Sequence, residues 1–229
     1  MQDRILVFAP HPDDETLGCG GTIAKEVGDG NIVHIVFLTD GRNSHKTVLG
    51  IQRNPDPEEV KVIRRGEAQT VARLLGVGVG NLTFMDYVDG YLTEQISRAT
   101  ERVRSILASV EPNAIFAPDE RDLHRDHQAT NTVVKSALDG WSSRVDLYKY
   151  LIWSDTEHES APPTKGDNSV QIDISAYLEL KRKAIATYRS QTVLLFPSQT
   201  RPVLLTAFVS KFLLPIERFC VESKSVYSR

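Results

Sequence analysis

Short apolar runs that alternate with longer amphipathic stretches are the feature of this chain that most limits its fold. Residues 4–9 and 31–39 are rich in Val, Ile and Phe, as buried strands usually are. A helix start follows further on, where Asp56 can cap and Pro57 suits the first helical position. Alternation of this kind predicts a parallel sheet covered by helices. We therefore expect a Rossmann-like α/β fold, an open and mostly parallel sheet with helices on both faces in three layers (α/β/α).

The remaining expected elements continue this alternation to about residue 189. Further strands are expected near residues 82–85, 114–117, 145–153 and 170–172. Helices are expected near residues 18–30, 57–76, 93–110 and 177–189, and another is expected to begin at or just before His127. Polar loops are expected at residues 41–52 and 161–168.

Composition limits the classes of protein that fit. With 229 residues, of which 41% are hydrophobic and 25% charged, the chain predicts one globular domain over residues 1–229. A net charge of -3 gives no field that would attract nucleic acid, so no nucleic-acid partner is expected. No run approaches the ~20 apolar residues of a membrane span. Cys19 and Cys220 lack metal-binding spacing and, with no apparent signal segment, favour a reducing, cytoplasmic location.

Two clusters of metal-binding side chains each follow an expected strand. One runs from His11 to Glu15, and the other runs from Asp122 to His127. If the two strands are parallel neighbours, both clusters lie at the carboxyl edge of the sheet, where open α/β folds bind ligands. His11, Asp14 and His127 supply the three ligands of a catalytic zinc, which keeps a further position for water or substrate. The sequence therefore predicts a metal site at this edge.

The two clusters resemble those of the PIG-L/LmbE family of metal-dependent de-N-acetylases, which hydrolyse the acetamide of N-acetylglucosamine derivatives. The resemblance covers roughly residues 4 to 191, since the segments at 64–76 and 172–191 are also similar to family segments. Arg125 stands where the family usually has Pro, and Gly66 stands where it usually has Glu. The resemblance implies a zinc-dependent N-deacetylase, a hydrolase of linear amide C–N bonds. Its substrate would be an N-acetylglucosamine-containing small molecule or glycoconjugate.

The resemblance also implies how the metal and the base would act. His11, Asp14 and His127 would hold Zn²⁺, with Fe²⁺ or Co²⁺ as alternatives. A metal lowers the pKa of its bound water and polarises a carbonyl group. Asp13 would be the general base for this metal-activated water, a role that needs a carboxylate outside the ligand set.

Four further residues receive roles from the resemblance. His124 would stabilise the tetrahedral oxyanion, with the imidazolium form as one alternative, and Asp126 would orient and charge it. Arg64 matches a position that reaches the substrate, and Asp89 matches one that binds sugar hydroxyl groups.

Ordinary structural roles account for other polar and glycine residues. Glu15 is expected to complement the dipole of a helix start and to hold the loop. The glycines of residues 18–21 lack dinucleotide-loop spacing and are expected to allow close helix-to-sheet packing. His34 is expected at the edge of the core, whereas His45 and His158 are expected to be solvated in loops.

Two other functions remain open from the sequence. Two His and one carboxylate also form the ligand set of non-haem iron oxygenases, although the strand and helix alternation opposes their usual barrel scaffold. A sugar-binding metal protein without turnover is the non-enzymatic alternative. The apolar segment at 203–214 is expected to pack on the sheet or to contact another subunit in a homo-oligomer, and peripheral membrane contact is its rarer interpretation.

Overall fold

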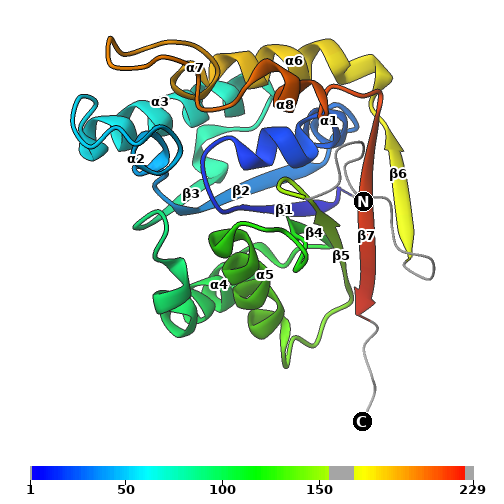
Figure 1. The fold of residues 1–229 in the computed structure, drawn as a ribbon. Coiled ribbons are helices and arrows are strands. Elements are labelled where there is room, and N and C mark those ends of the chain that lie inside the picture. The colour runs from blue at the N-terminus through cyan, green and yellow to red at the C-terminus, as the bar shows by residue number, and fades with distance from the viewer. Residues whose placement is uncertain (1, 155–167, 225–229) are drawn as a thin grey trace.

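The computed structural model describes residues 2–154 and 168–224, in which seven strands form one sheet of order β3-β2-β1-β4-β5-β7-β6 (Figure 1). The strands are β1 (Arg4–Ala9), β2 (Ile32–Thr39), β3 (Leu82–Tyr87), β4 (Ala114–Pro118), β5 (Val145–Tyr150), β6 (Ser169–Asp173) and β7 (Ile216–Lys224). The helices are α1 (Asp14–Gly28), α2 (Ser44–Leu49), α3 (Pro57–Leu74), α4 (Ile96–Val110), α5 (Arg125–Leu138), α6 (Leu178–Thr187), α7 (Arg189–Thr192) and α8 (Thr206–Ser210). Short 3₁₀ turns cover Val79–Asn81, Leu92–Gln95 and Ser175–Tyr177.

The pairing of the strands brings the two polar clusters together. Strands β3, β2, β1, β4 and β5 are parallel, and β1 lies between β2 and β4. Leu6 of β1 is paired with Ile115 of β4, so both strands end at the same edge of the sheet. The expected neighbourhood of these strands is confirmed.

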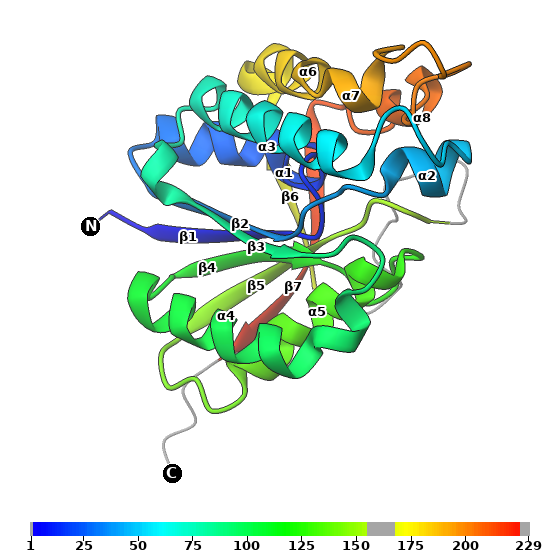
Figure 2. The same ribbon diagram turned by 90° about the vertical axis from the view of Figure 1, so that its left-hand side faces the viewer.

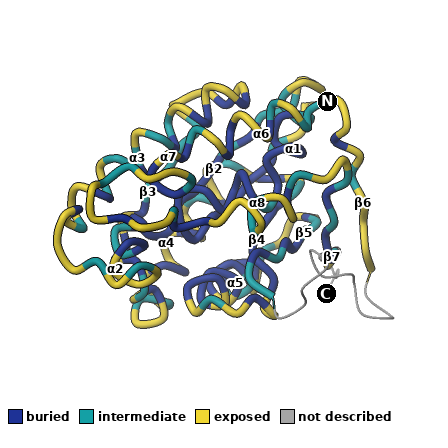
Figure 3. Tube along the Cα trace, turned by 45° about the horizontal axis from the view of Figure 1, so that its top comes forward, coloured by how far each residue is buried: buried dark blue, intermediate teal, exposed yellow. Residues whose placement is uncertain are grey.

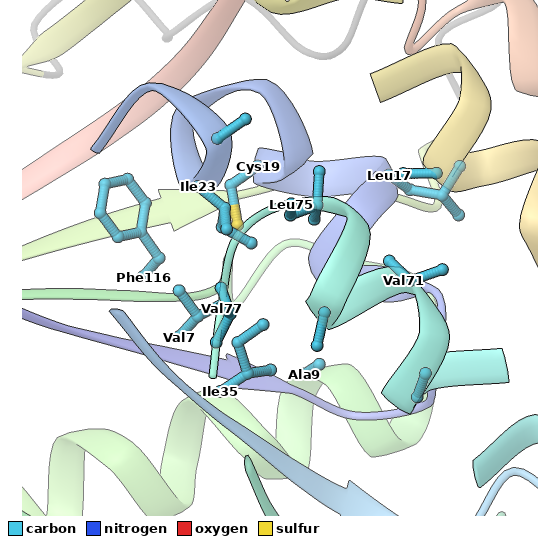
Figure 4. Close-up of a cluster of buried hydrophobic side chains, with 14 of the residues drawn as sticks. Val7, Ala9, Leu17, Cys19, Ile23, Ile35, Val71, Leu75, Val77 and Phe116 are labelled. Atoms are coloured by element: carbon cyan, nitrogen blue, oxygen red, sulfur yellow. The ribbon is translucent and has the colours of Figure 1, made fainter. Parts of the chain in front are cut away.

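Helices cover both faces of the sheet, which confirms the three-layer fold. In Figures 1 and 2, α1, α3 and α6 lie on one face, and α4 and α5 lie on the other. Each face has its own buried apolar cluster, and Figure 4 shows part of the cluster under α1 and α3. Figure 3 shows the central strands as buried, while exposed residues lie along the outer helices and loops. The sheet, packed on both faces, is thus the base for the loops at its carboxyl edge.

Close packing explains the glycines at the start of α1. A Cβ atom at Gly18 would lie 2.5 Å from the ring of Tyr150 in β5, and one at Gly21 would overlap the side chain of Ile174. The helix is kinked at Cys19, where the backbone is not helical (φ -146°, ψ 24°). The packing role expected for these glycines is confirmed.

Several elements differ from expectation, and the short helices α7 and α8 are among those that were not expected. Helix α2 lies within the segment expected as a polar loop, and β7 was not expected at all. Strand β7 pairs antiparallel with β5 and with β6, so the sheet is mixed at this side. His158 and nearly all of the loop expected at 161–168 lie outside the described residues.

The segment at 203–214 contributes to the core. Val203, Leu204 and Phe212 are buried, and Phe208 of α8 stacks on Trp153 with ring centroids 4.4 Å apart. These contacts agree with the expected packing role. Among the helices that the structure describes, none combines the length and the apolar character needed to cross a bilayer.

Candidate active site

A pocket of about 340 Å³ opens at the carboxyl edge of the sheet, in the size range of small-molecule sites. Its polar wall includes the loop after β1, and its other walls come from α2, the loop after β3 and the start of α5. Leu17, Trp153, Val203 and Leu204 form an apolar part of the wall. The pocket can therefore hold a ligand that has both polar and apolar parts.

The three expected metal ligands converge on one carboxylate oxygen. Asp14 Oδ2 lies 3.0 Å from His11 Nδ1 and 3.2 Å from His127 Nε2. All three residues are buried, and His127 is 0% exposed. The loop after β1 and helix α5 thus place two imidazoles against one acid, although more than a hundred residues separate them in the sequence.

Further carboxylates face the other nitrogen of each imidazole. Asp122 Oδ2 lies 3.0 Å from His127 Nδ1, while His11 Nε2 lies 3.1 Å from Asp89 Oδ1 and 3.3 Å from Asp126 Oδ2. A carboxylate behind a metal-binding His is the usual arrangement, because it fixes the tautomer and increases the basicity of the ligand.

The donor set fits a cation. Burial alone would lower the pKa of His127, but Asp14 and Asp122 raise it to about 9. In the same way, Asp89, Asp126 and Asp14 outweigh burial and raise the pKa of His11 well above its ordinary value. Both nitrogens of His127 are buried and lack a hydrogen bond of acceptable geometry, although carboxylate oxygens lie within 3.2 Å. A divalent ion would satisfy these carboxylates and the buried Nε2 atom.

His11 belongs to two groups of potential ligands among the described residues. One group joins it to His124 and His127, and the other joins it to Asp89 and Asp126, with all donor atoms of each group within 4.8 Å of one another. The site therefore has more donor groups than one ion needs, which leaves carboxylates and an imidazole to contact a substrate.

Asp13 is held beside this group in a conformation that residues with a side chain rarely adopt. Its φ is 135°, its N–H donates to Glu15 Oε2 at 3.0 Å, and Arg64 donates to its Oδ1 atom at 2.8 Å. Burial raises the pKa of Asp13 to about 8, whereas the guanidinium of Arg64 acts in the opposite direction. A carboxylate whose pKa is near neutral pH is suited to general-base chemistry.

The contacts of Glu15 agree with its expected structural role. It is 1% exposed, and its Oε1 atom accepts hydrogen bonds from Tyr188 and Thr16. Because its Oε2 atom binds the N–H of Asp13, it fixes the loop that carries the candidate base.

Arg64 lines the pocket but is almost fully buried, at 3% exposed. Besides Asp13, it donates to the carbonyl oxygens of Pro12 and Gly41. A Cβ atom at Gly41, whose φ is +64°, would lie 2.6 Å from Arg64 Nη1, so only glycine fits there. The contacts described for Arg64 position Asp13, and its expected contact with the substrate stays a prediction.

The contacts of His124 differ from those expected. The backbone N–H of Asp126, rather than its carboxylate, binds His124 Nδ1 at 3.2 Å. The carboxylate instead accepts from the N–H groups of Gly90 and Leu92 and faces His11. Burial and the two neighbouring imidazoles lower the pKa of His124 to about 4. The backbone of Asp126 thus orients the His124 ring with Nδ1 as the acceptor, which favours a ring proton on Nε2, and the expected charging of His124 by the Asp126 carboxylate stays a prediction.

Asp89 lies at the centre of the site. It lines the pocket and its Oδ2 atom accepts from the N–H of Asn43 at 3.0 Å. Burial raises its pKa, but His11 outweighs burial, and the result is a pKa of about 2. Asp89 is thus ionised beside His11, and its expected contact with sugar hydroxyls stays a prediction.

Asp122 supports the site, although no specific role was expected for it from the sequence. Asp122 is 0% exposed, and its carboxylate also accepts from the N–H groups of His124, Ile152 and Trp153. Its place five residues before His127 in the same polar cluster was the available signal.

His45 is buried rather than solvated. It lies in α2 with 1% of its surface exposed, and its Nδ1 atom lies 3.2 Å from the hydroxyl of Ser44. Ser44 lines the pocket and also accepts a long contact of 3.4 Å from Gln191. The solvated loop expected for His45 is wrong, because α2 turns this side chain under Phe196.

Comparison with known proteins agrees with this geometry. A Rhodococcus jostii protein, 1D-myo-inositol 2-acetamido-2-deoxy-alpha-D-glucopyranoside deacetylase, is 27% identical and is matched over 86% of this chain and 84% of its own length. A Bacteroides thetaiotaomicron glucosamine-6-phosphate deaminase-like protein is 26% identical over 82% of this chain, but the chain spans only 36% of its length.

Solved structures share the fold. The N,N'-diacetylchitobiose deacetylase of Pyrococcus horikoshii superposes with a TM-score of 0.65 at 28% identity, over 82% of this chain and 70% of the other. The family model for PIG-L, GlcNAc-PI de-N-acetylase, matches residues 6–138, which is more than half of the chain and includes both polar clusters. The chain therefore belongs to the PIG-L family, as its motifs predict.

Proposed function

We propose that this protein is a metal-dependent hydrolase that removes the acetyl group from an N-acetylglucosamine-containing small molecule or glycoconjugate. The observation that carries the proposal is the convergence of His11, His127 and Asp14 at one point. Beside them lies Asp13, a buried acid whose pKa is raised and which is not one of the expected metal ligands. A protein that only bound metal would have no need for this adjacent base. The relatives named as deacetylases of amino sugars support the same reaction.

The residues that would hold the ion are His11, Asp14 and His127, and the ion we propose is zinc. These three give the nitrogen and oxygen donors that zinc prefers. Asp122 would support His127 from behind, and Asp89 and Asp126 would support His11. When bound, the ion would polarise the acetamide carbonyl and lower the pKa of water at the site.

Asp13 moves the proton in the proposed reaction. As the base, it accepts a proton from the attacking water while the new C–O bond forms at the acetamide carbon. As the C–N bond breaks, it returns this proton to the sugar nitrogen, so that acetate and a free amine are the products. Arg64 and the Glu15 carboxylate keep Asp13 in position through both steps.

His124 stabilises the oxyanion as a neutral donor. Its Nδ1 atom accepts from the backbone of Asp126, so the ring proton is on Nε2 and is available for a hydrogen bond to the substrate oxygen. A neutral imidazole suits a site that contains two other imidazoles and would hold a cation. A fixed donor at the position where negative charge develops is typical of hydrolases.

The test is acetate release from a panel of N-acetylglucosamine glycosides by the zinc-loaded protein and by Asp13→Asn. We expect Asp13→Asn to keep one zinc per chain and to lose about 10²- to 10⁴-fold in kcat. Asp86→Asn is the matched control, because Asp86 is exposed and pairs with Arg65 outside the pocket. A wild type that binds the glycosides but releases no acetate would overturn the hydrolase in favour of a sugar-binding protein.

A further inference from the structure

Two cations on the pocket wall, Arg125 and Lys46, have no role in the chemistry described so far. Both side chains line the pocket, from the start of α5 and from α2, and neither has a hydrogen bond or ion pair to any described residue. The third cation of the pocket, Arg64, is buried and already bound to Asp13 and to two carbonyl oxygens. Only Arg125 and Lys46, among the cations described in this wall, are available to a ligand.

Arg125 occupies a position where a cation is unfavourable for folding. It is the first residue of α5, where the positive end of the helix dipole repels a positive side chain. The acid that follows it, Asp126, gives it no compensation, because that carboxylate is bound to Gly90 and Leu92. A charged side chain that is unfavourable at a helix start, and that no contact compensates, is typical of a functional site.

Arg125 lines the same pocket as His11, Asp13 and Asp14. It follows His124 directly, and the His124 ring lies 4.8 Å from the His11 ring between centroids. The planar guanidinium binds carboxylate and phosphate oxygens through two parallel hydrogen bonds. The helix end that disfavours Arg125 by itself would favour an anion bound to it.

We propose that Arg125, with added attraction from Lys46, binds an anionic substituent of the substrate, so that the preferred substrate is an N-acetylglucosamine derivative bearing a carboxylate or a phosphate. This inference deepens the proposed function and rests on it. The amino sugar lies at the polar end of the pocket with its acetamide at His11 and Asp13, and the charged substituent lies toward the rim at α5. Arg125 acts as a specificity residue rather than as a catalytic residue.

The experiment compares one neutral and two anionic probes with the zinc-loaded protein. The probes are methyl N-acetyl-α-glucosaminide, N-acetyl-α-glucosamine 1-phosphate and the carboxymethyl α-glycoside of N-acetylglucosamine. We expect kcat/KM for at least one anionic probe to exceed that for the methyl glycoside by about 10- to 100-fold, mainly through KM. The probe that gains more distinguishes a phosphate substituent from a carboxylate substituent.

Variants separate this subsite from general charge effects. Arg125→Gln should reduce the anionic-to-neutral ratio of kcat/KM by about 10-fold or more, and Lys46→Gln by about 2- to 5-fold. Arg144→Gln is the matched control, because Arg144 is an exposed cation just before β5, at the opposite edge of the sheet. Arg125→Glu suits the start of a helix, so we expect this variant to keep its thermal stability and to lose the anionic preference.

Calorimetric binding of the same three probes makes the result independent of turnover. If an anionic probe binds more tightly than the neutral probe, and if this difference depends on Arg125, the subsite is supported even when no acetate is released. The absence of acetate release would overturn the proposed function but not the subsite. Equal binding and equal kcat/KM for neutral and anionic probes would overturn the subsite, as would an unchanged ratio in Arg125→Gln.

Discussion

Asp13 has a main-chain conformation that costs about 1–3 kcal/mol for a residue with a side chain. Its φ of 135° persists because a carboxylate and a guanidinium bind it from two directions. The carboxylate comes from Glu15, two residues away, and the guanidinium comes from Arg64 in α3. Strain that neighbouring residues maintain in this way clusters at active sites, and here it fixes the one carboxylate that the proposed reaction needs as a base.

A second residue makes folding sensitive to acid. Burial lowers the pKa of His45 to about 4, and the nearby positive charge of Arg64 acts in the same direction. In the unfolded chain the same ring titrates near pH 6.5. Between these pH values the unfolded state binds a proton that the folded state does not, so stability is complete above pH 6.5 and decreases as the pH falls toward 4.

We expect His45→Gln to reduce this acid sensitivity. From pH 6.5 to 4, the unfolding free energy of the wild type should fall by up to ~1.4 kcal/mol per pH unit more than that of the variant. Urea denaturation at a series of pH values measures the difference. His34→Gln is the control, since His34 is only half-buried in β2 and should change the slope less. Parallel curves for wild type and His45→Gln would contradict the argument.

Individual site residues were predictable where the sequence places them next to a strand end. His11, Asp14 and His127 follow β1 and β4 closely, so their convergence required only that these strands be parallel neighbours. The partner of Asp126 was not predictable, because its carboxylate is bound by N–H groups of the loop after β3. The acceptor of a loop N–H group depends on how distant segments pack together. The spacing of residues within a motif does not predict it.

At the scale of elements, α1 depends on a contact from the far end of the chain. Just after the kink at Cys19, the N–H groups of Gly21 and Thr22 both donate to the carboxylate of Glu217 in β7. Lys181 of α6 binds the same carboxylate at 2.6 Å and is 1% exposed. This buried ion pair joins α6 and β7 to α1, the helix that carries Asp14.

Removal of one partner of this pair should be strongly destabilising. Lys181→Met leaves the Glu217 charge buried without its counter-ion, which we expect to cost about 3 kcal/mol of unfolding free energy. Lys25→Met is the matched control, because Lys25 pairs with Asp29 at the exposed end of α1. That variant should lose no more than ~0.5 kcal/mol. A similar loss in both variants, measured by urea denaturation, would show that burial of the pair is unimportant.

Elements with local signals were predicted well, and elements that depend on distant contacts were not. Helix α3 begins where Asp56 and Pro57 indicate, and Asp56 accepts from the N–H of Glu58. Helix α2 has only six residues, too few for an apolar period to appear. Strand β7 mixes charged and apolar residues, and its position between β5 and β6 is determined by pairing over a long sequence separation. A local window of sequence contains no information on such pairing.

For the whole molecule, metal binding should be linked to folding. The ligands come from the loop after β1, from the start of α1 and from α5, which only the folded sheet brings together. An ion that binds the folded state alone stabilises it by about 2.7 kcal/mol when its free concentration is 100 times Kd. The same ion would compete with protons at His11 and His127, whose pKa values the surrounding carboxylates raise.

We therefore expect zinc to raise the Tm of the metal-free protein by roughly 5–10 °C at 100 times Kd, given the length of the chain. Asp122→Asn removes the carboxylate behind His127 and should weaken zinc binding by about 10- to 100-fold, so at the same zinc concentration it should lose half or more of this shift. Asp86→Asn changes an exposed acid outside the pocket, so this variant should keep the full rise in Tm. Calorimetric melting with zinc and with a chelator measures all three proteins. If the shift were the same in Asp122→Asn, the stabilising ion would not be at His127, since loss of the supporting carboxylate would then have no effect.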